Sequence, residues 1–216
     1  MASTFGAQRG LSVDVPLAWH HWAHAAIAAC LLGGSVLLAG CAAGGPAQPA
    51  ASRAAGDAPI DPAAQAEFVV AVQLLEAERY TQGIARLESV AERAPSAAAP
   101  HVNLAMAYLR LDKHQAAEES FQKALALEPE HPVANNEYGV LLRKQGRFDE
   151  ARRHYQTALA AYPDFHPARR NLGILCDLYL NDARCALEHY QAYAKAVPGD
   201  ETVKLWVVDL KRRVGE

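Results

Sequence analysis

Residues 98–163 read AAPHVNLAMAYLRLDKHQAAEESFQKALALEPEHPVANNEYGVLLRKQGRFDEARRHYQTALAAYP, and one pattern occurs twice within them. In each half, apolar residues recur at steps of three or four through two consecutive segments, which is the spacing of one helix face. A proline follows the second segment each time. Proline stops a helix because it lacks a backbone donor and restricts the residue before it. The stretch therefore predicts two helical hairpins in succession.

The same period continues on both sides of this stretch. Pro95, Pro129 and Pro163 are 34 residues apart, and Pro198 follows 35 residues later. We expect repeats at about 64–97, 98–131, 132–165 and 166–199, and a last helix at 200–214. Small residues allow two helices to approach closely, and a large residue fills the space where they diverge. One small and one large position recur in every repeat: Ala71 and Leu87, Ala105 and Phe121, Gly139 and Tyr155, Gly173 and Tyr190.

A period of this length with this pattern is similar to the tetratricopeptide repeat (TPR). The resemblance implies an all-α fold, a right-handed helical solenoid of about four helical hairpins plus a C-terminal capping helix. A terminal helix covers the apolar side that stacked repeats leave exposed. Trp206 is then the centre of this cap, with a partner-binding role as the alternative.

Residues 1–60 are rich in Ala, Gly and Pro and carry few charges. Residues 25–40 form an apolar run of 16, shorter than the roughly 20 residues of a membrane-spanning helix and suited to a signal peptide. The run ends in LAGC (residues 38–41), which resembles the lipobox of bacterial lipoproteins. The resemblance implies a lipoprotein signal peptide over 1–40, and a lipidated Cys41 that begins a flexible tether over 41–60. Ala42, where Asp would retain the protein at the inner membrane, implies an outer-membrane anchor facing the periplasm.

Two features leave alternatives open at this end of the chain. Arg9 is the one Lys or Arg before the apolar run, although signal peptides usually begin with several. The lead-in before the run is long, so the true start codon can lie further downstream. A buried Ala/Leu helix and a plain transmembrane anchor are therefore the competing interpretations.

The rest of the sequence argues against catalysis, cofactors and nucleic acid. A formal net charge of −3 provides no basic field for DNA or RNA. No nucleophile with a base, glycine-rich phosphate loop or pair of acid/base carboxylates is evident, so we expect no enzyme, no catalytic residue and no small-molecule substrate. Histidines at equivalent positions of successive repeats do not converge on one point, so we expect surface histidines and no metal site. They are His101, His114, His131, His154, His166 and His189.

Cys176 and Cys185 are the two cysteines of the repeat region. They lie near the end of one predicted helix and the start of the next, so a disulfide across the hairpin turn is possible. Closing so small a loop stabilises by roughly 2.5 kcal/mol in the chain-entropy model. The alternative is a pair of reduced core cysteines.

In TPR arrays the first helix of each hairpin lines a concave groove, so the resemblance implies a peptide-binding surface. Asn103 and Asn171 offer amides that can both donate to and accept from an extended peptide. The surface is apolar toward the first repeat and basic around Arg143, Lys144 and Arg170. By this family geometry the lining comprises Phe68, Val69, Val72, Val102, Asn103, Met106, Arg110, Asn136, Glu137, Val140, Arg143, Lys144, Arg170, Asn171, Ile174 and Asp177.

Residues 38–198 resemble lipid-anchored TPR proteins of Gram-negative bacteria, including the pilotins of type IV pili. The resemblance implies an outer-membrane scaffold whose partner is a protein and whose membrane contact is the N-terminal lipid. It would act in the assembly of a cell-envelope machine such as a pilus or secretin. The alternatives are an adaptor for peptidoglycan hydrolases, a component of TonB–ExbB type transport, an envelope enzyme or, without lipid on Cys41, a soluble cytoplasmic TPR co-chaperone.

Overall fold

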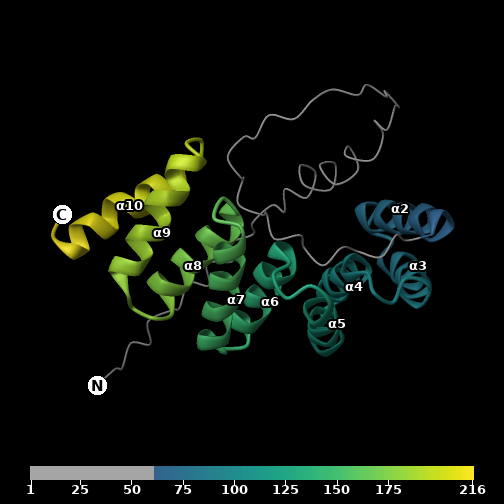
Figure 1. The fold of residues 1–216 in the computed structure, drawn as a ribbon. Helices are drawn as coiled ribbons and strands as arrows, with labels where there is room; N and C mark the ends of the chain where they lie inside the picture. Colours follow the sequence, from purple (N-terminus) through teal and green to yellow (C-terminus); the bar gives the residue numbers. More distant parts are fainter. Residues whose placement is uncertain (1–60) are drawn as a thin grey trace, which may run out of the picture. The chain divides into compact units, whose positions relative to one another are not determined.

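The computed structural model describes residues 61–216; the predicted signal peptide, Cys41 and the tether lie outside the described residues. Within that part the chain forms nine α-helices and no strand, which confirms the all-α solenoid (Figure 1). Eight helices pair into hairpins, and α10 follows the last hairpin. The helices are α2 (Pro62–Glu76), α3 (Tyr80–Arg93), α4 (Ala98–Arg110), α5 (His114–Leu127), α6 (Pro132–Lys144), α7 (Phe148–Ala161), α8 (His166–Leu178), α9 (Ala183–Ala196) and α10 (Glu201–Val214).

Local capping interactions set several helix starts. The Asp61 carboxylate accepts hydrogen bonds from the backbone N–H groups of Ala63 and Ala64, both at 2.9 Å. Asp200 accepts in the same way from the N–H of Val203 at 3.1 Å. These side chains satisfy donors that the first turn of a helix leaves without an internal partner.

The turn inside each hairpin uses a left-handed residue at a recurring position. These residues are Glu78 (φ 58°), Asp112 (φ 54°), Gly146 (φ 79°) and Asn181 (φ 50°). The first three are 34 residues apart and the fourth follows 35 later, which is the period of the prolines. The turn conformation therefore repeats with the sequence, although the residue type at the turn does not.

The two helices of a hairpin approach most closely at the small positions. A Cβ atom on Gly139 would lie 2.6 Å from Cε1 of Tyr155, and one on Gly173 would lie 2.5 Å from Cε1 of Tyr190. Both tyrosine rings are buried. The glycines are thus required by the close packing of the helix pairs.

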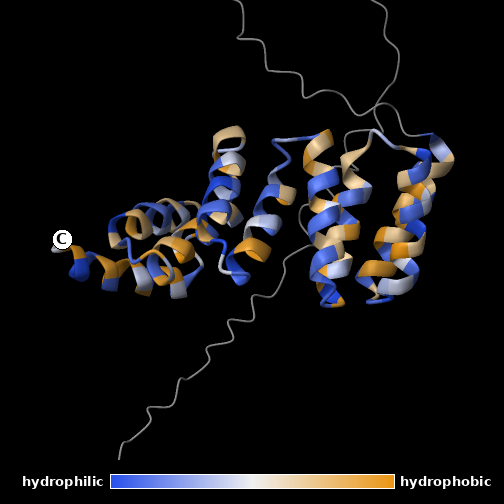
Figure 2. Cartoon of the chain, turned by 90° about the horizontal axis from the view of Figure 1, so that it is seen from below, coloured by the Kyte–Doolittle hydropathy of each residue, from blue (hydrophilic) through white to orange (hydrophobic). Residues whose placement is uncertain are grey.

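Successive hairpins stack through their neighbouring helices. The second helix of each hairpin packs against the first helix of the next, as in the stacked rings of Phe121 and Tyr138, whose centroids lie 5.6 Å apart. First helices also contact one another directly (α2 with α4, α4 with α6, α6 with α8), whereas the second helices of residues 61–216 do not. The first helices are therefore the closer-spaced row. Figure 2 shows that the helices carry apolar and polar residues together, as amphipathic packing requires.

The predicted C-terminal cap is seen in α10. Val203 and Leu210 are buried, and the ring of Trp206 packs at a tilt against Tyr190 of α9 with centroids 5.1 Å apart. Trp206 thus takes part in covering the last hairpin.

Candidate protein-interaction face

The first helices form a continuous row, and every residue predicted to line the groove lies on α2, α4, α6 or α8. We call this set of residues the inner face. Side chains bridge it between repeats: the amide of Asn171 on α8 donates to Oδ1 of Asn136 on α6 at 2.9 Å. The row is therefore one connected surface.

The inner face is apolar at its N-terminal end. Phe68 packs against the core cluster of the first hairpin, and Val69 and Val72 are half-buried. Val102 and Met106 on α4 are buried, Met106 with 8% of its surface exposed. Met106 therefore supports this end of the face from below, and the neighbouring half-buried valines are the side chains available for contact.

Three asparagines lie in the middle of the face, and two of them, Asn136 and Asn171, are hydrogen-bonded to each other. Asn136 is only 2% exposed, and it accepts from Asn171 and donates to Glu137 Oε1 at 2.8 Å. Asn103 donates to the backbone carbonyl of Ala99 at 2.9 Å. These hydrogen bonds orient the amides, so Asn103 and Asn171 offer a partner only their remaining donors and acceptors.

Glu137 is a half-buried carboxyl on this face. Burial raises the pKa of Glu137, against the opposing effects of the hydrogen bond from Asn136 and of the nearby charges on Lys144 and Arg110. A carboxyl in this position gains from any donor that a partner brings to it, because a buried acceptor without full hydrogen bonding is costly.

The C-terminal half of the face is basic, and two of its arginines are fixed on aromatic rings. The guanidinium of Arg143 lies 5.3 Å from the ring centroid of Tyr179 and donates to the Tyr179 hydroxyl at 3.2 Å. Arg170 lies 5.3 Å from the ring centroid of Trp206, with its Nε 3.7 Å from the Asp200 carboxylate. Cation–ring contacts of this kind restrain the side chains and leave the charge in place.

The remaining predicted residues complete this half of the face. Arg110 and Lys144 are exposed at the ends of α4 and α6, and Val140 is half-buried between them in sequence. Asp177 is paired with Arg213 of α10 at 2.6 Å. Sequence reasoning missed Tyr179 as a component of the face; an aromatic residue at the end of a first helix was the available signal.

The two cysteines of the repeat region meet across the turn between α8 and α9. They form a disulfide with a Cα–Cα distance of 5.8 Å and a sequence separation of 9. The covalent link joins the last turn of α8, next to Tyr179, to the first turn of α9. It therefore restrains the hairpin that carries the basic end of the inner face.

The six histidines are exposed to different extents. His114 is exposed, whereas the other five are partly buried. The Nδ1 atom of His154 lies 2.8 Å from Oδ1 of Asn135, and its ring centroid lies 4.7 Å from that of Tyr138. His154 on α7 is partly covered because Asn135 and Tyr138 of α6 pack against it, a contact that the pattern of a single helix does not reveal.

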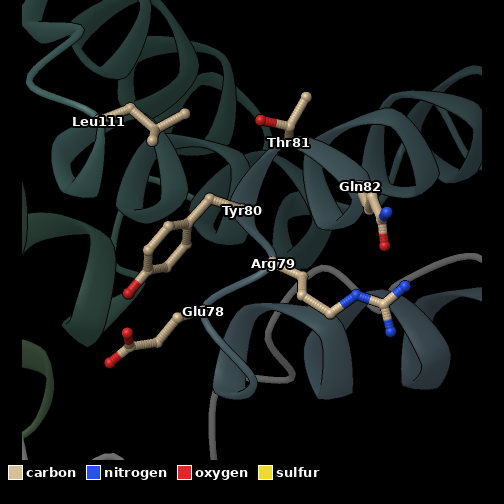
Figure 3. A pocket seen from close by; sticks show the side chains of 6 residues that line it. All are labelled: Glu78, Arg79, Tyr80, Thr81, Gln82 and Leu111. Atoms are coloured by element: carbon tan, nitrogen blue, oxygen red, sulfur yellow. The ribbon is translucent and has the colours of Figure 1, made fainter.

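Outside the inner face, the described residues provide a shallow pocket and no metal-binding cluster. Among residues 61–216 no group of three or more His, Cys, Asp or Glu side chains is placed to hold a metal ion. A shallow pocket lies at the turn between α2 and α3, where the side chains of Glu78 and Arg79 point in opposite directions (Figure 3). In the same part of the chain no helix has the length and apolar character to cross a bilayer. The extended inner face is therefore the candidate site.

The fold and its period define a tetratricopeptide repeat protein, and the comparisons with known proteins agree. Two family models described as tetratricopeptide repeat match residues 71–132 and 111–173.

The chain is also similar to the type IV pilus assembly protein PilF of Pseudomonas aeruginosa. The two are 28% identical over 181 residues, which cover 82% of this chain and 69% of PilF. A solved structure of P. aeruginosa pilF aligns with a TM-score of 0.65 at 26% identity, covering 71% of this chain and 69% of that one.

Two further similarities concern the repeat fold. MamA (residues 41 to the end) from Desulfovibrio magneticus RS-1 aligns with a TM-score of 0.62 at 20% identity, covering 73% of this chain and 88% of that one. SPINDLY of Petunia hybrida, a probable UDP-N-acetylglucosamine–peptide N-acetylglucosaminyltransferase, is 40% identical over 57 residues. Those residues are 26% of this chain and 6% of SPINDLY, so the chain spans a small part of that relative.

Proposed function

We propose that this chain is an outer-membrane lipoprotein whose TPR array binds a protein partner during assembly of a cell-envelope machine such as a type IV pilus. The similarity to PilF carries this proposal, because it extends over 82% of the chain. About 177 of the 216 residues are thus aligned. Even if the alignment ends at residue 216, it must begin at about residue 40 or earlier. The alignment therefore includes sequence that precedes the repeats, whereas TPR proteins in general share only the repeats.

The anchor in this proposal is Cys41, at the end of the apolar run 25–40. Acyl chains on this residue hold the protein at the membrane, with each buried methylene contributing about 0.8 kcal/mol. The disulfide between Cys176 and Cys185 suits an oxidising compartment such as the periplasm. A flexible tether over 41–60, as the sequence predicts, would let the array reach roughly 25 Å from its anchor and would raise its local concentration near membrane-bound partners.

The inner face carries the binding step and no chemistry of its own. Its basic half favours an acidic segment of the partner, because Arg143 and Arg170 are already restrained on Tyr179 and Trp206 and lose little further freedom on binding. The half-buried valines at the other end take apolar side chains. The face thus selects a partner segment with acidic and apolar portions in a fixed order.

Membrane attachment is tested by the mass and location of the mature protein in its native host. We expect a chain that starts at Cys41, carries acyl mass and separates with the outer membrane. Cys41→Ala should abolish all three properties, whereas Cys30→Ala, within the same apolar run, should leave them unchanged. An unprocessed or soluble wild-type chain would refute the anchor.

Partner binding is tested by charge reversal on the inner face. The partner is first identified by cross-linking in cells and its segment is then titrated against the purified protein. We expect Arg143→Glu to weaken binding by about tenfold or more, since the substitution places like charges together. Arg153→Glu, an exposed arginine of the second helix α7, is the matched control and should bind as the wild type does. Equal affinities for both variants would exclude the inner face.

A further inference from the structure

In the repeat register α10 stands in the position of a first helix, although its backbone does not contact α8 as the other successive first helices contact one another. Its buried residues Val203 and Leu210 stand 35 residues after Ala168 and Leu175, which are buried at the same positions of α8. α10 packs against α9 as α8 packs against α7. In register α10 therefore corresponds to the first helix of a further hairpin, and among residues 61–216 no second helix packs on it.

First helices contact their own second helix through three recurring positions. The first position is held by Glu67 in α2, which accepts from Arg93 of α3 at 2.9 Å. In α6 the same position is held by Asn135, which lies 2.8 Å from His154 of α7. The second is Gly173 in α8, which meets Tyr190, and the third is Cys176, which is bonded to Cys185. In α10 these three positions are Lys204, Val208 and Lys211.

These α10 residues are open to solvent. Val208 is 57% exposed, and Leu205, one residue after Lys204, is 70% exposed. Lys211 is exposed, and Lys204 pairs only with Glu201 of its own helix at 2.8 Å. A purely protective cap has a polar outer face, so two exposed aliphatic side chains between two lysines need another explanation. We call Lys204, Leu205, Val208 and Lys211 the open stripe.

We propose that the open stripe binds an acidic amphipathic helix of a partner protein, which completes a fifth hairpin as its second helix. The position of Lys204 supports the charge of this partner. At the same position of the first hairpin, Glu67 binds the oppositely charged Arg86 and Arg93 of its second helix. With lysine at this position and at 211, the complementary helix carries Asp or Glu, and its apolar side covers Leu205 and Val208.

The composition of the stripe favours a helix over other occupants. A bilayer-binding helix buries a wide apolar face, commonly with Trp or Phe, whereas Trp206 is packed against Tyr190 and under Arg170. A second copy of α10 would bring lysines against lysines. Leu205 stands 35 residues after Arg170 of the inner face, so the open stripe adjoins that face, whereas Lys204, Val208 and Lys211 stand at the positions that face a second helix. This binding surface does not depend on the lipid anchor.

The test is site-specific photocross-linking in the native host, with the full chain carrying p-benzoylphenylalanine at position 205. The matched position is 162, because Tyr162 is also exposed and lies at the end of a second helix. We expect an adduct at 205 and not at 162. Peptide mapping should place it on a segment of another protein with acidic residues at helical spacing.

Charge variants then test whether the partner binds through the lysines of the open stripe. The double variant K204E/K211E should lose the adduct at least tenfold. K123E/K195E, which changes two exposed lysines of α5 and α9, should keep it. Reversing the acidic residues of the partner helix should restore the adduct with K204E/K211E. Both variants must match the wild type in helix content and unfolding midpoint.

Four results would overturn the proposal. They are no adduct at 205, an adduct with lipid, an adduct with a second copy of this chain, and a partner adduct that K204E/K211E does not reduce. The first would make α10 a solvated cap, and the second and third would identify a membrane or self-association surface instead.

Discussion

The turn residues show how one backbone conformation recurs with four different side chains. Glu78, Asp112, Gly146 and Asn181 all adopt positive φ at the same position of their hairpins. Glycine alone takes this conformation without a steric cost, which for other residues is about 1–2 kcal/mol. The packing of the hairpins therefore imposes the turn even where the residue opposes it.

Gly146→Ala should lower the free energy of unfolding by about 1 kcal/mol. The cause would be backbone conformation alone, because a Cβ at this position meets no atom within 4 Å. Gly199→Ala is the control, since its Cβ also meets nothing and its φ is not positive. Asp112→Gly should have the opposite sign. Urea unfolding measures all three, and equal losses for the two alanine variants would contradict the argument.

Gly139→Ala should destabilise through a different cause. Its Cβ would lie 2.6 Å from the buried ring of Tyr155, and overpacking of this kind costs about 1–3 kcal/mol. The loss should largely disappear in a Tyr155→Leu background, where the ring is gone. A double-mutant cycle by urea unfolding checks this, and a coupling energy near zero would show that Gly139 is not required by the ring.

His154 makes the stability of the fold dependent on pH. Burial, assisted by the charge of Arg153, lowers the pKa of His154 below its ordinary value of 6.5. Below pH 6.5 the unfolded chain then binds more protons than the folded one, so the free energy of unfolding falls as the pH falls toward the folded-state pKa.

His154→Gln should therefore reduce the decline in stability between pH 7 and pH 5, although it lowers stability at pH 7. The exposed His114 provides the control variant His114→Gln, which should decline as the wild type does. Urea unfolding at several pH values gives the slopes. An unchanged slope for His154→Gln would exclude this histidine as a source of the pH dependence.

At the scale of elements, the α8–α9 hairpin is the one pair among the described helices joined by a disulfide. Replacing Cys176 and Cys185 by alanine should lower the free energy of unfolding by about 2.5 kcal/mol, because the unfolded chain regains the entropy of a small loop. Reductant should destabilise the wild type and leave the double variant unaffected. Equal stability of the wild type with and without reductant would mean that the two thiols are not bonded in the protein.

The succession of helical hairpins was predictable from sequence. Their limits depend on local signals, such as Pro132 at the start of α6 and the 34-residue spacing of the prolines. The contacts of the inner face were not predictable in the same way. Arg143 meets Tyr179 from 36 residues away, and Asn136 meets Asn171 from 35, so these pairs depend on how consecutive hairpins stack.

At the scale of the whole repeat region, each helix contacts only its near neighbours in the sequence. Polar links between hairpins follow the same rule: Glu118 on α5 accepts from Tyr138 on α6 at 2.8 Å and from Arg147, just before α7, at 2.6 Å. The stability of such an array is approximately a sum of hairpin and interface contributions. Each terminal hairpin of the array packs against one neighbouring hairpin, whereas each central hairpin packs against two. The terminal hairpins should therefore unfold locally before the central ones.

Amide hydrogen exchange tests this gradient. Protection should be greatest in α5, α6 and α7 and lowest in α2 and α10, since local opening requires fewer contacts to be broken at the ends. Truncation after Gly199 should then lower protection in α9, because it removes Trp206 from Tyr190 and exposes the last hairpin, and should leave α2 and α3 unchanged. Equal loss of protection in all hairpins would instead show that residues 61–216 open as a single cooperative unit, and the nearest-neighbour description would have to be abandoned.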